Sequence, residues 1–284
     1  MRRLRVGSLI VVTVAAIACL VLGSTTAAAG AGGQVVIPRG EPVQLALVGS
    51  SDFPDFTTNF RNALRMAIER HPTIRGHAIQ INESDPACFS GDFLAANAAN
   101  AAAVVSNAQN TAVIGQICSQ AAVSALPVYE TAGIVTISGS ASNSSLPTLA
   151  PTVFNRTIVV SDAPGDAGDV WLAGLATLPS DLAFQQAYQA EFGTPPLTFT
   201  DLYFDAASLA LARIKQTSRS EDGRLVIDRA ALAEAVRDTT DFNGVTCTVT
   251  LDPATGNRVN DPAALARCAN QDEDDDLAPE THDH

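Results

Sequence analysis

Two short polar segments follow apolar runs at places where a ligand could bind. The first is Gly115-Gln-Ile-Cys-Ser-Gln120, which ends an apolar run and opens a predicted helix. Ser119 and the unpaired N–H groups of that helix start would favour a carboxylate. The second is Ile137-Ser-Gly-Ser-Ala-Ser-Asn143, whose hydroxyls and backbone carbonyls could take an ammonium group. Together the two segments would hold the two charges of an amino acid.

Each segment on its own also has an ordinary structural interpretation, because small polar residues at strand ends commonly cap helices and close turns. Enzymatic interpretations are weaker. The sequence contains no Ser/His/Asp motif, His-Glu-x-x-His or phosphate loop, and Ser119 has no plausible base near it. His71 and His77 are interpreted as surface or strand residues. We therefore expect that the chain is not an enzyme and that it uses no cofactor or metal.

The elements that must position these segments alternate regularly in the first half of the chain. Apolar runs typical of buried strands cover residues 43–49, 77–82, 111–115 and 133–137. Helical patterns cover residues 57–70, 94–108 and 118–130. The fold class is therefore predicted to be α/β, with a doubly wound parallel sheet and helices on both faces. In such sheets ligands bind at the carboxyl ends of the strands, where both polar segments lie.

The second half of the chain is less regular. Aspartate-rich turns interrupt residues 157–183. Helices are then predicted over 184–192 and 200–216, and a further helix runs from Asp228, a plausible N-cap, to Arg237. Residues 244–251 alternate as a strand.

The N-terminus has the order of a secretory signal peptide. A basic start (residues 2–5) precedes an apolar stretch (residues 9–22), and small residues follow up to Ala31. This pattern predicts cleavage near residue 29 and export to the periplasm or the extracellular space. An uncleaved anchor is disfavoured because the stretch is short. A lipid anchor on Cys19 is disfavoured because the apolar run continues beyond it.

Charge and composition restrict the partners. The formal net charge is −13, and removal of the basic start would make it more negative. Nucleic acid and anionic membrane surfaces would be repelled by such a chain, so neither is an expected partner. Residues 269–284 are acidic and nearly free of apolar side chains, which predicts a solvated, disordered tail.

Four cysteines remain when Cys19 is removed with the signal peptide. In an oxidising compartment an even number indicates disulfides, and three pairings are possible. The local pairing, Cys88 with Cys118 and Cys247 with Cys268, is favoured because each pair lies within one section of the chain. No pair has Cys-x-x-Cys spacing, which argues against zinc.

The two polar segments also belong to a longer pattern. Gly115-Gln-Ile-Cys-Ser, Pro127-Val-Tyr-Glu and Ile137-Ser-Gly-Ser-Ala-Ser-Asn together resemble the leucine/isoleucine/valine-type binding proteins of bacterial ABC transporters. The likeness continues in Val153-Phe-(x)-Arg-Thr157, in the helix that ends at Gly193, in Phe204-Asp-Ala206 and in residues 242–250. It covers most of residues 43–258.

This resemblance implies an exported protein that binds a small molecule, such as a branched-chain amino acid, for an ABC permease. In that family the hydroxyl after the disulfide cysteine binds the ligand carboxylate, which here is Ser119. A small residue's carbonyl and a threonine in the second segment take the ammonium and carboxylate, here Ser140 and Ser142. The candidate ligand-binding residues are Ser119, Gln120, Ser140, Ala141, Ser142 and Phe56. Asp85-Pro-Ala-Cys88 looks like the family's first half-cystine, which supports the Cys88–Cys118 bond.

The chain departs from the family in length. Family members are two-lobed clamshells, and a doubly wound second lobe needs on the order of a hundred residues. Only residues 157–183 stand in its place here. We therefore expect a signal peptide (1–29), a ligand-binding lobe (30–156), a shortened remnant or crossover (157–183), returning helices and a strand (184–268), and the acidic tail (269–284). Ligand affinity should be weakened. The alternative function is a sensor or protein-interaction module that forms a homodimer.

Overall fold

The computed structural model describes residues 33–160, 181–259 and 261. The predicted signal peptide with Cys19, the predicted half-cystine Cys268, the acidic tail and most of the interval 157–183 lie outside these residues. Within them, no helix is long and apolar enough to cross a membrane.

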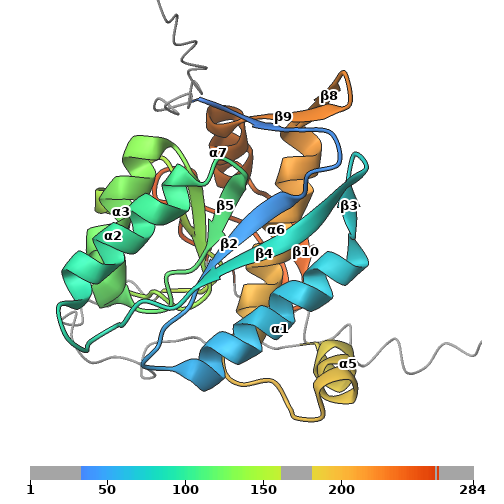
Figure 1. Ribbon diagram of the computed structural model, residues 1–284. Helices are drawn as coiled ribbons and strands as arrows, with labels where there is room; N and C mark the ends of the chain where they lie inside the picture. The colour runs from blue at the N-terminus through green and yellow to red at the C-terminus, as the bar shows by residue number, and fades with distance from the viewer. Residues whose placement is uncertain (1–32, 161–180, 260, 262–284) are drawn as a thin grey trace, which may run out of the picture.

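A six-stranded sheet forms the centre of the fold (Figure 1). In spatial order its strands are β3 (Thr73–Ile74), β4 (His77–Ser84), β2 (Val43–Val48), β5 (Asn110–Ile114), β6 (Val135–Ser138) and β7 (Phe154–Arg156). Neighbours pair in parallel except β3, which pairs antiparallel with β4 at the edge. The central strand β2 is hydrogen-bonded on both sides and its side chains are almost all buried, which explains its continuous apolar run.

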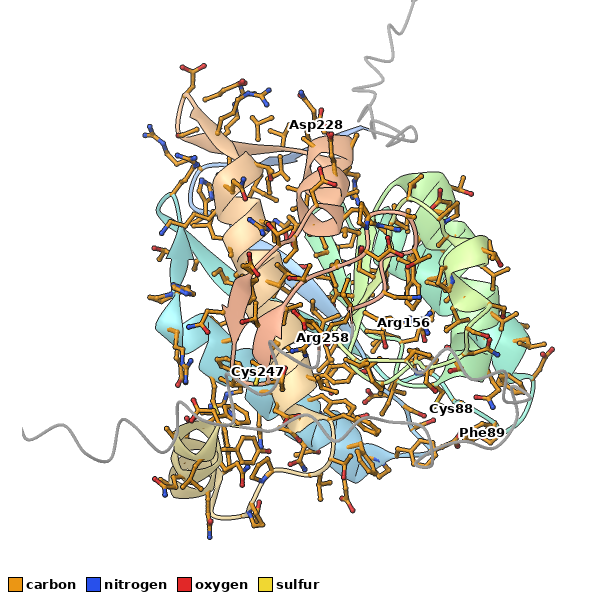
Figure 2. The ribbon with its side chains drawn as sticks, turned by 180° about the vertical axis from the view of Figure 1, so that it is seen from behind. Cys88, Phe89, Arg156, Asp228, Cys247 and Arg258 are labelled. Carbon is orange, nitrogen blue, oxygen red and sulfur yellow. A yellow bond between two sulfur atoms is a disulfide. The ribbon has the colours of Figure 1, made fainter. Side chains whose placement is uncertain are left out.

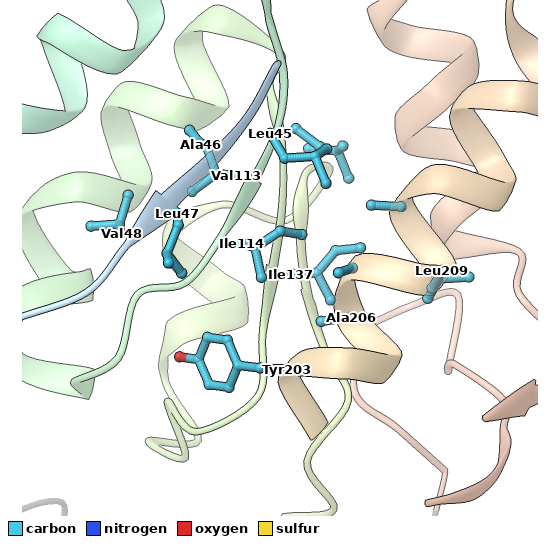
Figure 3. Close-up of a cluster of buried hydrophobic side chains, with 14 of the residues drawn as sticks. Leu45, Ala46, Leu47, Val48, Val113, Ile114, Ile137, Tyr203, Ala206 and Leu209 are labelled. Carbon is cyan, nitrogen blue, oxygen red and sulfur yellow. The ribbon is translucent and has the colours of Figure 1, made fainter. Parts of the chain in front are cut away.

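Helices cover both faces of this sheet (Figure 1). The pair on one face is α2 (Phe93–Ser106) and α3 (Ser119–Ala132), and the pair on the other is α1 (Pro54–Arg70) and α6 (Thr200–Thr217). Figure 3 shows Ala46 and Val48 of β2 on the side of α2 and α3, and Leu45 and Leu47 on the side of α6. Successive strand residues point to opposite faces, so one strand serves both layers. The predicted fold class is confirmed.

Local signals explain where several helices begin and end. Pro54 lies in the first turn of α1, where a backbone N–H has no helical partner in any case. Gly133 ends α3 in the left-handed conformation, with φ of 63°. The predicted cap Asp228 is confirmed, because its side chain accepts the N–H of Ala231 at the start of α7 (Arg229–Arg237).

The C-terminal half of the chain packs onto the same body. It also contains α5 (Leu182–Phe192), and the short α4 (Leu146–Leu149) precedes β7. Phe60 of α1 stacks on Tyr203 of α6, with ring centroids 3.7 Å apart. A small sheet joins β1 (Gln34–Ile37) to β9 (Arg224–Asp228) and β8 (Arg219–Glu221). Because β1 pairs with β9, the beginning of the described chain is tied to its C-terminal section.

The predicted strand over residues 244–251 is wrong in its extent. The structure instead has a hairpin of β10 (Phe242–Gly244) and β11 (Cys247–Val249). The N–H groups of Val245 and Thr246 donate to the carboxylate of Asp205 on α6, at 2.7 and 3.1 Å. Because those groups are bonded to a side chain, they cannot take part in a strand ladder.

Candidate functional site

The two polar segments lie side by side at the carboxyl edge of the sheet. β5 leads into the segment that opens α3, and its neighbour β6 leads into the loop 138–145. The backbone N–H of Asn143 donates to Ser119 Oγ at 3.1 Å and ties the loop to the helix start. The structure therefore brings the two segments together, while their role in ligand binding stays a prediction.

Ser119 has the geometry of a donor for a ligand carboxylate. It is half-buried at the first position of α3, and no side chain caps this helix start. Because its oxygen accepts the N–H of Asn143, its own hydroxyl hydrogen is available for donation. The uncapped N–H groups and the helix dipole favour an anion at the same place. Gln120, also half-buried, follows it in the first turn.

The polar groups at the start of the loop bond mainly within the protein. The Ser140 hydroxyl donates to the carbonyl of Ile117 at 2.8 Å and bonds with the Tyr203 hydroxyl at 3.0 Å. Ser138 Oγ accepts the N–H of Ala141 at 2.9 Å. These contacts match the structural interpretation of turn-forming residues. Ser140 therefore retains its main-chain carbonyl, rather than its hydroxyl, as a group for a ligand.

Ala141 and Ser142 differ in the groups they leave open. Ala141 is buried, and its carbonyl accepts a hydrogen bond from the guanidinium of Arg156 at 3.2 Å. Ser142 is half-buried, and its hydroxyl makes no hydrogen bond with the part of the chain that the structure describes. Of the two loop serines predicted to bind a ligand, Ser142 has the more available hydroxyl.

Arg156 is a residue of this site that sequence reasoning missed. It ends β7, is fully buried, and reaches the loop 138–145 with Nη1, which lies 2.9 Å from the Asn143 carbonyl (Figure 2). Its Nε donates to Asn257 Oδ1 at 2.8 Å. Burial lowers the pKa of Arg156 to about 10. The signal in the sequence was the polar run Asn155-Arg156-Thr157, which lies at the end of the segment that forms β7.

Aromatic side chains form a cluster at the same edge of the sheet. The predicted ligand residue Phe56 is half-buried and packs edge-on against Phe53, with centroids 6.3 Å apart. Phe53 packs edge-on against Phe89 at 5.8 Å. Phe89 remains 44% exposed. Sequence reasoning missed Phe53 and Phe89, because it did not combine them with the disulfide that draws the loop of Phe89 toward α3.

The Cys88–Cys118 disulfide predicted from the sequence is confirmed, with the two Cα atoms 5.9 Å apart. It connects the residue before Phe89 to the residue before Ser119, so the aromatic cluster and the start of α3 are held near one another (Figure 2). Cys247 is also disulfide-bonded. Its predicted partner, Cys268, lies outside the described residues.

Clusters of metal-binding side chains and the histidines bear on a metal or catalytic centre. Among the residues that the structure describes, no group of three or more His, Cys, Asp or Glu side chains could hold a metal ion. His77 is buried in β4, and its Nδ1 lies 2.8 Å from the carbonyl oxygen of Glu41. That contact belongs to a strand residue, as predicted.

Comparison with known proteins relates this geometry to one fold. No family model matches the sequence, and no curated protein is significantly similar to it. Solved structures do match. A putative branched-chain amino acid ABC transporter protein from Rhodospirillum rubrum aligns with a TM-score of 0.63 at 15% identity, over 78% of this chain and 96% of that one.

Two further structures were determined with ligands. The substrate-binding protein LivJ from Streptococcus pneumoniae, in complex with isoleucine, aligns with a TM-score of 0.59 at 16% identity, over 78% of this chain and 94% of that one. A solute-binding protein from Rhodopseudomonas palustris BisB5, in complex with 3,4-dihydroxybenzoic acid, aligns with a TM-score of 0.63 at 14% identity, over 77% and 91%. At such identities the likeness shows the fold alone, which is that of type I periplasmic binding proteins, as the resemblance implied.

Proposed function

We propose that this chain is an exported solute-binding protein that recognises an amino acid of the branched-chain type for an ABC transporter, and that it is not an enzyme. The observation that carries the proposal is the Ser119 hydroxyl at the uncapped start of α3, bonded to the neighbouring loop 138–145. Ligands in this fold bind at the carboxyl ends of the strands, beside helix N-termini.

The carboxylate is the part of the ligand with the strongest support. Ser119 can donate its hydroxyl hydrogen, and the first N–H groups of α3 point to the same place. The ligands named for two of the similar structures, isoleucine and 3,4-dihydroxybenzoic acid, both carry a carboxyl group. In our proposal the ammonium group meets the Ser140 carbonyl, the Ser142 hydroxyl adds a donor for the carboxylate, and Gln120 and the backbone of Ala141 lie beside the same site.

An apolar ligand side chain would meet the aromatic cluster. Phe56 lies in this cluster, and Phe89 presents a partly exposed ring on the side of the disulfide. An apolar group buried against such rings gains about 25 cal/mol for each Å² removed from water. This gain favours leucine, isoleucine or valine over small polar amino acids.

The exposed ring of Phe89 also favours a second candidate function. In a sensor or interaction module, a homodimer would cover apolar side chains at the open edge of the sheet. Sedimentation at rising protein concentration separates the two candidate functions. A protein that stays monomeric at all concentrations would exclude the homodimer and would still be compatible with ligand binding.

The proposed function is tested by replacing Ser119 with alanine. We expect that the exported wild-type protein binds leucine and that Ser119→Ala raises the dissociation constant about tenfold or more, because a hydrogen bond to a charged group contributes about 1.5–3 kcal/mol. NMR titration of the wild type and of Ser119→Ala with leucine, isoleucine, valine and 4-hydroxybenzoate measures the dissociation constants.

Ser124→Ala is the matched control. This serine lies on the same helix, but its hydroxyl bonds to the Ala121 carbonyl within the helix. The affinity of Ser124→Ala for leucine should equal that of the wild type. Unchanged affinity in Ser119→Ala would remove Ser119 from the site, and a wild-type protein that binds none of the four probes would refute the proposed function.

A further inference from the structure

The loop 138–145 is held from two sides. On one side, Ser138 Oγ donates to the Gln116 carbonyl at 2.8 Å and accepts the N–H of Ala141. On the other, Arg156 Nη1 donates to the carbonyls of Ala141 and Asn143 at 3.2 and 2.9 Å. The guanidinium therefore bonds to two loop residues at once.

Asn257 orients this guanidinium. Its Oδ1 accepts the Nε–H of Arg156 at 2.8 Å, although the two residues are 101 positions apart in the sequence. The ring of Phe154 lies 5.5 Å from the guanidinium carbon and adds a cation–π contact. The arginine side chain thus has a defined orientation toward the loop.

The burial of Arg156 is costly. The residue is fully buried, and its Nη2 has no hydrogen-bond partner within the described part of the chain. A charge in this environment loses its hydration, and no salt bridge with a carboxylate is found for it among the described residues. An apolar residue of similar size would avoid that cost. What the guanidinium provides in its place is a planar set of donors that bond to the loop carbonyls.

Asn143 connects this arginine to Ser119. Its carbonyl accepts from Arg156, and its N–H donates to Ser119 Oγ. When the Ser119 oxygen accepts that N–H, the hydroxyl hydrogen is left for an outside acceptor. The position of Asn143 therefore decides how the Ser119 hydroxyl is oriented.

We propose that Arg156 is the positioning residue of the ligand-binding loop: it holds the carbonyls of Ala141 and Asn143 so that the Asn143 N–H reaches Ser119 and directs its hydroxyl to a ligand carboxylate. Arg156 does not touch the ligand. The ligand part of this inference rests on the proposed function, whereas the hold on Asn143 is a property of the protein without ligand.

Amide hydrogen exchange at Asn143, measured without ligand, directly tests whether Arg156 keeps the Asn143 N–H bonded to Ser119. Arg156→Gln should exchange this amide at least tenfold faster than the wild type, and Arg156→Lys, which keeps the charge and can bond to a carbonyl, should lie between the two. In the same variants the dissociation constant for leucine should rise in the same order. Unchanged exchange at Asn143 in folded Arg156→Gln would overturn the proposal.

Two further variants separate positioning from general stability. Arg229 is another buried arginine, and its Nη2 donates to the carbonyl of Asn110 at 3.3 Å, at the opposite end of β5. Arg229→Gln should lower the unfolding midpoint but leave Asn143 exchange and leucine affinity unchanged. Asn257→Ala is a milder change for the case in which Arg156→Gln does not fold, and it should raise Asn143 exchange at least threefold.

The outcomes distinguish this inference from the proposed function. Faster exchange at Asn143 in a protein that binds none of the probes would support the hold by Arg156 and refute the proposed function. The opposite result is also possible: ligand binding depends on Ser119, but Asn143 exchange and ligand affinity are unchanged in Asn257→Ala and in Arg156→Gln. That result would support the proposed function and refute the positioning role of Arg156.

Discussion

At the scale of single residues, Asp52 connects charge to the geometry of the candidate site. Its carboxylate accepts the N–H groups of Cys88 and Phe89 at 2.7 and 2.9 Å, and the Ser90 hydroxyl at 2.8 Å. The N–H of Phe89, followed by the Ser90 hydroxyl, lowers the pKa of Asp52 from its ordinary value of 3.8. This carboxylate therefore holds the loop that carries Phe89 and the disulfide.

The pH dependence follows from the sign of that shift. Because the pKa of Asp52 is lower in the folded state than in the unfolded chain, its ionised form stabilises the fold at pH values above 3.8. This stabilisation is lost as the pH falls from 3.8 through the lowered native value. The difference in unfolding free energy between the wild type and Asp52→Asn should shrink over that window, measured by denaturant titration at each pH.

Asp55→Asn serves as the control for this prediction, because Asp55 lies on the exposed first turn of α1. Asp55→Asn leaves the hydrogen bonds between Asp52 and residues 88–90 in place, so this variant should still show the loss of stability that comes from Asp52. A wild-type minus Asp52→Asn difference that stays constant down to pH 2 would contradict the assignment.

At the scale of elements, α6 connects the sheet to the C-terminal hairpin. Asp205 on this helix is fully buried and accepts the N–H groups of Val245 and Thr246. The buried guanidinium of Arg258 donates to the Thr246 carbonyl and to the carbonyl of Thr157, at 2.5 and 3.1 Å. One helix residue therefore secures the segment that follows β10, and Arg258 ties that segment to the end of the main sheet.

We predict that Asp205→Ala lowers the unfolding free energy by about 2–4 kcal/mol, because it leaves two buried N–H groups and the Thr246 hydroxyl without their acceptor. Chemical denaturation measures the change. Glu69→Ala, at an exposed position of α1, should stay within about 0.5 kcal/mol of the wild type. A loss below about 1 kcal/mol for Asp205→Ala would show that the hairpin is held by other contacts.

At the scale of the whole molecule, the described residues contain one doubly wound sheet with the candidate site at its carboxyl edge. In a clamshell a second lobe excludes water and strengthens the polar contacts of the ligand. The expectation that residues 157–183 replace most of such a lobe stays a prediction, because most of that interval lies outside the described residues. The absence of most of the second lobe would directly weaken the affinity for leucine.

If one lobe acts alone, leucine should bind at about millimolar strength, which corresponds to about 4 kcal/mol. Isothermal titration of the exported protein should therefore show weak heat or none, while NMR titration detects the binding. A sub-micromolar dissociation constant would contradict the view that the closing half is missing.

Local patterns were sufficient for most of the sheet and its helices. The apolar runs predicted β2, β4, β5 and β6, and helical spacing predicted α1, α2 and α6, each within a few residues of the observed bounds. The pairing of β1 with β9 was not predicted. These strands are short and lie nearly two hundred residues apart, so only packing against the rest of the fold brings them together.

The sequence by itself predicted the fold class and the two polar segments, because both depend on patterns within short stretches of chain, and it favoured the Cys88–Cys118 bond among three possible pairings. Only the tertiary structure decided which polar groups remain open to a ligand. The Ser140 hydroxyl is bonded to Tyr203, which lies 63 positions away, and Arg156 is oriented by Asn257, which lies 101 positions away. Hydrogen bonds over such separations form only after the helices and strands have packed, and no local pattern encodes them.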